Sequence, residues 1–124
     1  MEDRYEKGLK QFLEMGGPDG LAMIENMKET SPDLARFVVE FAFGDIYPRP
    51  GLDLRTRMLA TVAALTALGN AQPQLKANIG NALKVGCTRE EILEVIIQMA
   101  VYAGFPAALN GAFAAREVFS ELDG

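Results

Sequence analysis

Apolar residues recur along this chain at helical spacing, and glycine, proline and capping residues divide it into short segments. Near the start, Leu9, Phe12 and Leu13 occupy the i, i+3 and i+4 positions of one helix face. Further on, the hydroxyl of Ser31 can cap a helix that has Pro32 at its first position. The alternation typical of half-buried strands is missing. The pattern predicts an all-α fold of six to seven helices, expected at residues 2–15, 21–28, 32–44, 54–68, 73–86, 88–103 and 106–122.

The helix expected at 32–44 gathers apolar side chains on one side: Leu34, Phe37, Val38, Phe41 and Ala42. An apolar stripe of this kind normally faces the core of a protein. We therefore interpret its phenylalanines, together with Phe43 and the six methionines, as core residues.

Two of the expected helices are apolar on nearly all sides. Two threonines interrupt residues 58–68, and three polar side chains interrupt residues 92–103. A helix that is hydrophobic nearly all round is normally buried nearly all round. A chain of 124 residues offers few such positions, so we expect subunit interfaces to cover part of these helices in a homo-oligomer.

The composition indicates one globular domain, residues 1–124, and excludes several function classes. The net charge of −5 argues against an extended nucleic-acid interface and against an anionic membrane as partner. No apolar run reaches the roughly 20 residues that a bilayer span requires. The chain has no histidine, which excludes histidine-dependent triads and imidazole metal sites.

The single cysteine cannot form an internal disulfide or a CxxC redox pair. With no disulfide framework and with a charged amino-terminal segment, we expect a cytoplasmic location. No phosphate-binding loop, dinucleotide fingerprint, calcium loop or zinc spacing occurs, so we expect neither a metal nor a cofactor.

Three arginines, Arg49, Arg55 and Arg57, lie within nine residues. The second and third fall in the first turn of a helix, where a cation opposes the helix dipole. A planar guanidinium can bind a carboxylate through two hydrogen bonds, so the cluster is a candidate binding site for an acidic substrate. The alternative is that these arginines form structural salt bridges to nearby acidic residues: Glu40, Asp45 and Asp53.

Glu94, Gln98 and Tyr102 recur every four residues and form one polar stripe on the apolar helix at 88–103. If the stripe lines a pocket, Gln98 binds substrate, and Glu94 or Tyr102 transfers a proton. The alternative is a hydrogen-bonded network between subunits. Glu91, three residues after Thr88, is interpreted as part of a capping box.

The motifs in two longer runs resemble those of the carboxymuconolactone decarboxylase family. The first run covers residues 43–57, FGDIYPRPGLDLRTR, and the second covers residues 86–108, GCTREEILEVIIQMAVYAGFPAA. Residues 5–9 are similar as well, so the resemblance spans almost the whole chain. It implies the all-helical fold of the alkylhydroperoxidase D-like superfamily, assembled as a trimer or hexamer. It also implies decarboxylation of a small anionic lactone such as 4-carboxymuconolactone, in the degradation of aromatic acids.

The chain departs from the family pattern at several positions. Members usually carry a histidine where this chain has Asn78, which can hydrogen-bond but cannot shuttle protons at neutral pH. Peroxidase-type relatives place CxxC cysteines at the positions of Ala71 and Gln74, and an acidic residue at that of Met58, so thiol peroxidase activity is disfavoured. Cys87 lies near a helix N-terminus, which can lower a thiol pKa, but a lone cysteine favours a structural role.

Two functional hypotheses follow. In the first, the chain is a decarboxylase: Arg49, Arg55 and Arg57 hold the substrate carboxylate, Asn78 and Gln98 line the pocket, and Glu94 or Tyr102 delivers the proton. In the second, it is a binding oligomer on the same fold, or an enzyme with altered chemistry, that takes small carboxylic acids.

Overall fold

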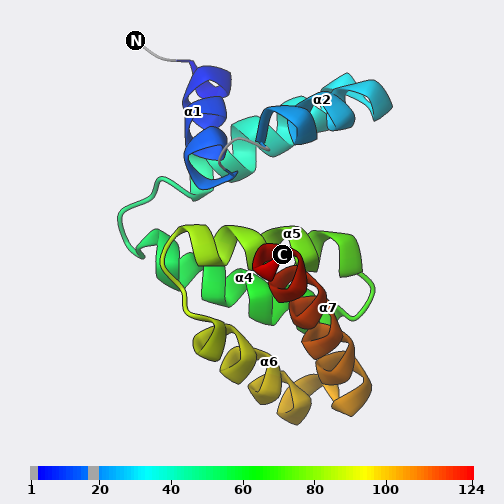
Figure 1. Ribbon diagram of the computed structural model, residues 1–124. Coiled ribbons are helices and arrows are strands. Elements are labelled where there is room, and N and C mark those ends of the chain that lie inside the picture. The colour runs from blue at the N-terminus through cyan, green and yellow to red at the C-terminus, as the bar shows by residue number, and fades with distance from the viewer. Residues whose placement is uncertain (1–2, 17–19) are drawn as a thin grey trace. The chain divides into compact units, whose positions relative to one another are not determined.

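The computed structural model describes residues 3–16 and 20–124, and all regular elements in those ranges are helices (Figure 1). The all-α prediction is confirmed. The chain divides into two compact units, Met1–Leu52 and Asp53–Gly124. Within the described ranges, no helix combines the length and apolarity that crossing a membrane requires.

The first unit consists of α1 (Arg4–Gly16), α2 (Gly20–Thr30), α3 (Pro32–Phe37) and η2 (Val38–Ile46). As expected, Ser31 caps α3, and its hydroxyl accepts a hydrogen bond from the Leu34 amide at 3.2 Å. α3 continues without a break into η2, which is a π-helix and extends beyond the expected end at residue 44.

Two glycines bring α1 and η2 into close contact, and this contact explains why Gly44 does not end the helix. A Cβ atom on Gly8 would overlap the carbonyl oxygen of Val39. A Cβ atom on Gly44 would lie 2.8 Å from the carbonyl oxygen of Arg4 and 3.6 Å from the Cα atom of Gly8. Both positions need glycine because the two backbones touch directly.

This contact buries the side of the helix opposite to the predicted one. Ala35, Val39 and Gly44 are buried, at intervals of four and five residues. Such intervals suit a π-helix, whose hydrogen bonds reach five residues back rather than four. Phe37 and Phe41 are 54% and 60% exposed, so their assignment to the core was wrong.

The core of the first unit is built from Phe12, Ile24 and Val39. The partly buried side chains that pack against it are Tyr5, Leu9, Met27 and Phe43. The rings of Phe12 and Phe43 meet edge to face with centroids 4.6 Å apart, so Phe43 does contribute to the core as predicted.

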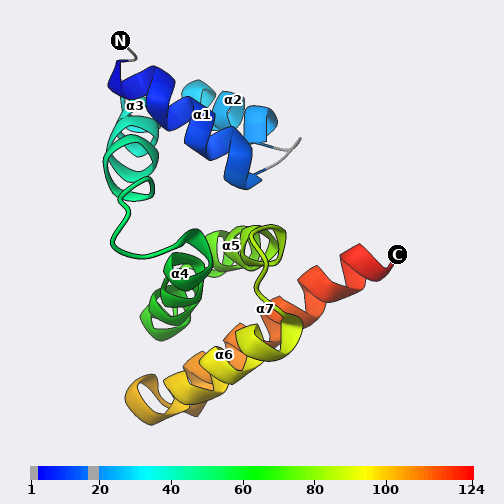
Figure 2. The same cartoon turned by 90° about the vertical axis from the view of Figure 1, so that its left-hand side faces the viewer.

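The second unit consists of α4 (Leu54–Leu68), α5 (Gln72–Lys84), α6 (Arg89–Ala103) and α7 (Phe105–Asp123). α4 packs against α5 and α6, and α7 lies along α6 (Figure 2). The fully buried side chains between them are mostly aliphatic and include Met58, Val62, Leu75, Ile79, Ile92 and Ile96.

The outer side of α6 is not covered within one chain. Ile97 and Val101 are 60% and 75% exposed in the single chain, on one of the two helices that we expected a subunit interface to cover in part. Phe105 and Leu109 of α7 are also exposed. The second unit therefore leaves a large apolar surface in contact with solvent.

Candidate functional site

The two arginines of α4 are positioned by the cap of that helix. Asp53 precedes α4, and its Oδ1 atom accepts a hydrogen bond from the Thr56 amide at 2.7 Å. This backbone hydrogen bond lowers the pKa of Asp53 below its ordinary value. The cap orders the first turn of α4, which carries Arg55 and Arg57. The backbone positions of both arginines are therefore well defined.

Arg55 forms an ion pair with Glu91 of α6. The other carboxylate oxygen of Glu91 accepts a hydrogen bond from the Thr88 amide at 2.9 Å, and the Thr88 hydroxyl accepts one from the Glu91 amide at 3.0 Å. The capping box predicted from the sequence is confirmed. One carboxylate thus caps α6 and holds Arg55, so an acidic substrate at Arg55 would compete with Glu91.

Cys87 lies beside this network and is buried. Its Sγ atom donates a hydrogen bond to the carbonyl oxygen of Arg55 at 3.4 Å. Burial raises the pKa of the Cys87 thiol, and the nearby Arg55 charge offsets only part of that effect. The pKa therefore moves opposite to the direction expected from the nearby helix N-terminus, and the contact fits a structural thiol.

Arg57 and Asn78 are both half-buried in the second unit. The Nε atom of Arg57 is shielded from solvent. The Asn78 side chain donates a hydrogen bond to the carbonyl oxygen of Gln74, one turn earlier in α5, at 2.8 Å. An anion beside Arg57 would meet a cation that is partly removed from water, where electrostatic attraction is stronger than at the open surface.

Glu94, Gln98 and Tyr102 lie on the exposed part of α6, and Tyr102 is 80% exposed. In the single chain these three side chains face solvent rather than an enclosed pocket. Their role in catalysis stays a prediction, and it requires something to cover this side of α6.

Arg49 belongs to the first unit, whereas Arg55 and Arg57 belong to the second. It is exposed and follows the end of η2, where its amide donates a hydrogen bond to the carbonyl oxygen of Ile46 at 3.1 Å.

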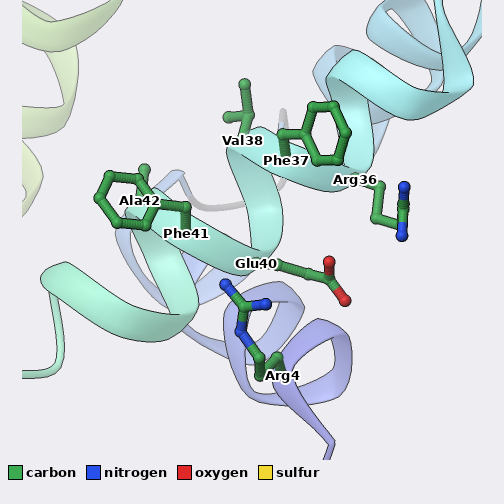
Figure 3. Close-up of a pocket in the computed structure, with 7 residues that line it drawn as sticks. All are labelled: Arg4, Arg36, Phe37, Val38, Glu40, Phe41 and Ala42. Atoms are coloured by element: carbon green, nitrogen blue, oxygen red, sulfur yellow. The ribbon is translucent and has the colours of Figure 1, made fainter.

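The first unit contains a pocket that the sequence did not predict. It lies along α3 and η2 and is lined by Arg4, Arg36, Phe37, Val38, Glu40, Phe41 and Ala42 (Figure 3). The figure shows the carboxylate of Glu40 pointing to the side on which Arg4 and Arg36 lie. The signal was present as the apolar stripe at 32–44, but the stripe was assigned to the core.

Arg4 also forms an ion pair with Asp45, in which the Nη2 atom of Arg4 lies 2.6 Å from the Oδ2 atom of Asp45. This hydrogen bond lowers the pKa of Asp45 and raises that of Arg4. Arg36 stacks on the ring of Phe37, with the guanidinium carbon 4.9 Å from the ring centroid.

A second hollow, the α6–α7 groove, lies in the second unit and measures about 290 Å³. All its lining residues are apolar: Leu93, Ile96, Ile97 and Ala100 of α6, and Phe105, Ala108, Leu109 and Ala112 of α7. The sequence indicated this surface through the excess of apolar positions in residues 92–103.

Within the described ranges, no group of three or more acidic or cysteine side chains is placed to hold a metal ion. The polar groups of α4 and α6 instead offer cations for an acidic ligand and carboxyl or phenol groups for proton transfer.

The sequence model of the carboxymuconolactone decarboxylase family matches residues 32–117. The chain is 35% identical to a 4-carboxymuconolactone decarboxylase of Acinetobacter baylyi, over 98% of this chain and 90% of that protein. It is 33% identical to an uncharacterised 15.0 kDa protein of Paracoccus denitrificans, over 99% of this chain and 98% of that protein. A nitrosuccinic acid decarboxylase of Metarhizium robertsii is 25% identical, over 95% of this chain and 82% of that protein.

Proposed function

The chain belongs to the carboxymuconolactone decarboxylase family, and from this premise we propose that it releases carbon dioxide from a small anionic lactone such as 4-carboxymuconolactone. The observation that carries the proposal is the 35% identity to a named 4-carboxymuconolactone decarboxylase over almost the whole of both chains. The nitrosuccinic acid decarboxylase, a more distant relative, has a name that shares the reaction type but not the substrate. Decarboxylation of a small acid is therefore better supported than any one substrate.

The reaction sets two demands on the protein. The bond between the carboxylate carbon and the ring carbon breaks, carbon dioxide leaves, and the electron pair stays on the ring carbon as a delocalised carbanion. The negative charge spreads through the ring double bond to the carbon next to the lactone carbonyl. A proton must reach that second carbon, and the double bond shifts to the decarboxylated carbon to give the enol-lactone. The site must stabilise the developing negative charge and hold a proton donor close to the carbanion.

We assign the binding of an anionic group of the substrate to Arg57. It is half-buried, so an anion beside it is screened by water less than at an exposed arginine. Arg55 serves chiefly as a structural residue in this proposal, because its guanidinium pairs with the carboxylate that caps α6. Asn78 and Gln98 stay candidates for hydrogen bonds to the substrate.

Glu94 and Tyr102 are the proposed proton donors, since the chain contains no histidine. Both are exposed in the single chain, and exposed Ile97 and Val101 lie among them on α6. We propose that self-association covers this side of α6 and excludes water from the reaction. A trimer or hexamer is the expected assembly, and the cytoplasmic location expected from the sequence stays a prediction.

The test is carbon dioxide release from 4-carboxymuconolactone by the purified protein, without added metal or thiol. Glu94→Gln should lower kcat about 10²–10⁴-fold if Glu94 is the donor, the usual effect of removing a general acid. Glu90→Gln, in the first turn of the same helix, is the matched control and should leave the rate unchanged. Tyr102→Phe tests whether Tyr102, the second candidate, is the proton donor instead of Glu94.

Arg57→Ala should reduce turnover about a hundredfold or more, because it removes a cation from the site of negative charge. Lys10→Ala, which removes an exposed cation of α1, is the control and should leave turnover unchanged. Absence of carbon dioxide release by the wild-type protein overturns the proposed substrate. Full activity of both Glu94→Gln and Tyr102→Phe overturns the proposed donors.

The second hypothesis, a binding protein for small carboxylic acids, is favoured by the absence of histidine from the chain. It predicts an increase in melting temperature with the lactone, without turnover. A ligand at a hundred times its Kd stabilises the folded state by about 2.7 kcal/mol, which a thermal scan detects.

A further inference from the structure

The chain exposes two surfaces that are rich in apolar side chains. One is the aromatic face of the first unit, which we define as Phe37, Val38, Phe41 and Ala42; the other is the α6–α7 groove of the second unit. We propose that the aromatic face of one copy of the chain docks into the α6–α7 groove of a second copy. The inference rests on the self-association proposed above and is independent of the decarboxylation chemistry.

The aromatic face cannot turn inward within its own unit. Gly8 and Gly44 fix the opposite side of the helix against the backbone of α1, so Phe37 and Phe41 must point outward. They lie four residues apart and project from neighbouring turns. Exposed aromatic pairs of this kind are typical of the anchor residues that dominate protein–protein interfaces.

The groove has room for these two rings. Alanines at positions 100, 108 and 112 line it between larger side chains such as Ile97 and Leu109. Its volume is about 290 Å³, and an apolar cavity of about 150 Å³ accommodates one benzene molecule. The groove can therefore hold about two phenyl rings, which is the number that the aromatic face presents.

Charged side chains of both signs lie beside the aromatic face, so individual side chains can pair with charges beside the groove. Arg36 stacks on Phe37 and lies 3.7 Å from the exposed Asp33, a pair that contributes little in water. Glu94 is exposed, and it precedes the groove residue Ile97 by about one helical turn on α6. An arginine beside the aromatic face can therefore meet a carboxylate beside the groove.

A second combination has the reverse order. Glu40 lies beside the aromatic face, and Arg116 of α7 follows the groove residue Ala112 by one turn. Each surface thus carries one acidic and one basic side chain next to its apolar centre.

The partner is a second copy because each chain supplies both halves of the contact. A contact between two different surfaces is heterologous, so every docked copy leaves one surface of each kind available, and repetition closes a ring when the geometry allows it. Pairing of two grooves with one another would leave the aromatic face exposed to water. Docking of the aromatic face also covers part of the exposed side of α6. Because Arg36 beside Glu94 would favour the ionised carboxylate, Tyr102 is the candidate proton donor in the docked state.

The test compares sedimentation of the full chain at micromolar concentration for the wild type and two variants. Phe41→Glu alters the aromatic face, and Ile97→Glu alters the groove; both side chains are 60% exposed, so neither change disturbs a core. Each variant alone should associate at least about thirtyfold more weakly, the change typical of losing an anchor residue. Leu21→Glu and Leu68→Glu, at exposed leucines outside both surfaces, should leave the assembly intact.

The decisive sample is an equal mixture of the two variants. A Phe41→Glu copy keeps an intact groove and an Ile97→Glu copy keeps an intact aromatic face, so the mixture should form a heterodimer that neither variant forms alone. A mixture that stays monomeric overturns the proposal, as does a wild-type chain that is monomeric. Association that Ile97→Glu abolishes and Phe41→Glu does not would show groove-to-groove pairing instead. Phe37→Glu with Leu109→Glu provides a second pair, and carbon dioxide release is measured separately.

Discussion

The two units build their interiors in different ways. In the first unit, α1 touches the backbone of η2 at Gly8 and Gly44, with no side chain between them. In the second unit, aliphatic side chains such as Leu75 and Ile92 fill the space between the helices. The first kind of contact tolerates no added atom, whereas the second loses stability when atoms are removed.

The difference also explains where the apolar surfaces lie. A helix that is held through glycines keeps its large side chains on the outside, so the first unit presents phenylalanines to solvent. α6 packs against its neighbours through some of its large side chains. Because it is apolar nearly all round, its other apolar side chains are exposed. Both units therefore leave surfaces that a second molecule can cover.

Truncation of a core side chain in the second unit should have the largest effect on stability. Leu75→Ala should lower the free energy of unfolding by about 3–5 kcal/mol, because it leaves a cavity where the leucine is almost fully buried. Leu68→Ala, at a leucine that is 64% exposed, should change it by less than about 0.5 kcal/mol. Urea denaturation measures both, and equal effects would contradict this description of the second unit.

Addition of one methyl group should have the next largest effect, in the first unit. Gly8→Ala should cost about 2–3 kcal/mol, because the new Cβ overlaps the carbonyl oxygen of Val39 and forces α1 away from η2. Amide hydrogen exchange in α1 and η2 should speed up accordingly.

Gly80 in α5 is the matched control, since a Cβ there meets nothing within 4 Å. Gly80→Ala should raise the free energy of unfolding by about 0.5–1 kcal/mol through its higher helix propensity. If Gly8→Ala is as well tolerated as Gly80→Ala, the backbone contact between α1 and η2 is not the main support of the first unit.

Loss of a helix cap should have a smaller effect, and it should differ between the units. Thr88→Ala should cost about 1–2 kcal/mol, because Thr88 belongs to a capping box whose glutamate also holds Arg55. Ser31→Ala should cost about 0.5–1 kcal/mol, since Ser31 supplies a single capping hydrogen bond. Thermal unfolding of the two variants compares them, and a larger loss for Ser31→Ala would argue against the linked role of Glu91.

Acid should produce the smallest effect at two exposed ion pairs, Arg4 with Asp45 in the first unit and Arg89 with Asp123 in the second. Arg4 lowers the pKa of Asp45 and Arg89 lowers that of Asp123, both from an ordinary value of 3.8. The unfolded carboxyl group binds its proton at higher pH than the folded one. The stabilisation is therefore complete above the ordinary pKa and is lost as the pH falls through the lowered pKa.

Carbon-13 NMR titration of the carboxyl groups tests both pairs. Arg4→Gln should raise the pKa of Asp45 and leave that of Asp123 unchanged, and Arg89→Gln should do the reverse. A variant that raises the pKa of both Asp45 and Asp123 would show that the two ion pairs are not independent.

Much of the fold could be predicted from local signals. Ser31, Asp53 and the pair Thr88 and Glu91 each cap a helix through hydrogen bonds to residues at most three positions away. Such contacts form between neighbours along the chain, so the sequence alone located the helix starts and the all-α class. The family motifs were likewise contiguous and could be recognised without a structure.

What the tertiary structure decided depends on residues far apart in the sequence. Gly8 meets Val39 and Gly44 across more than 30 residues, and this meeting selects the buried side of η2 and exposes Phe37 and Phe41. Arg55 forms an ion pair with Glu91 across a similar separation, so a candidate substrate-binding residue also contacts a helix cap. An apolar stripe shows that a helix face avoids water, but it cannot show whether its own unit or another molecule covers it, because both remove the same surface from solvent.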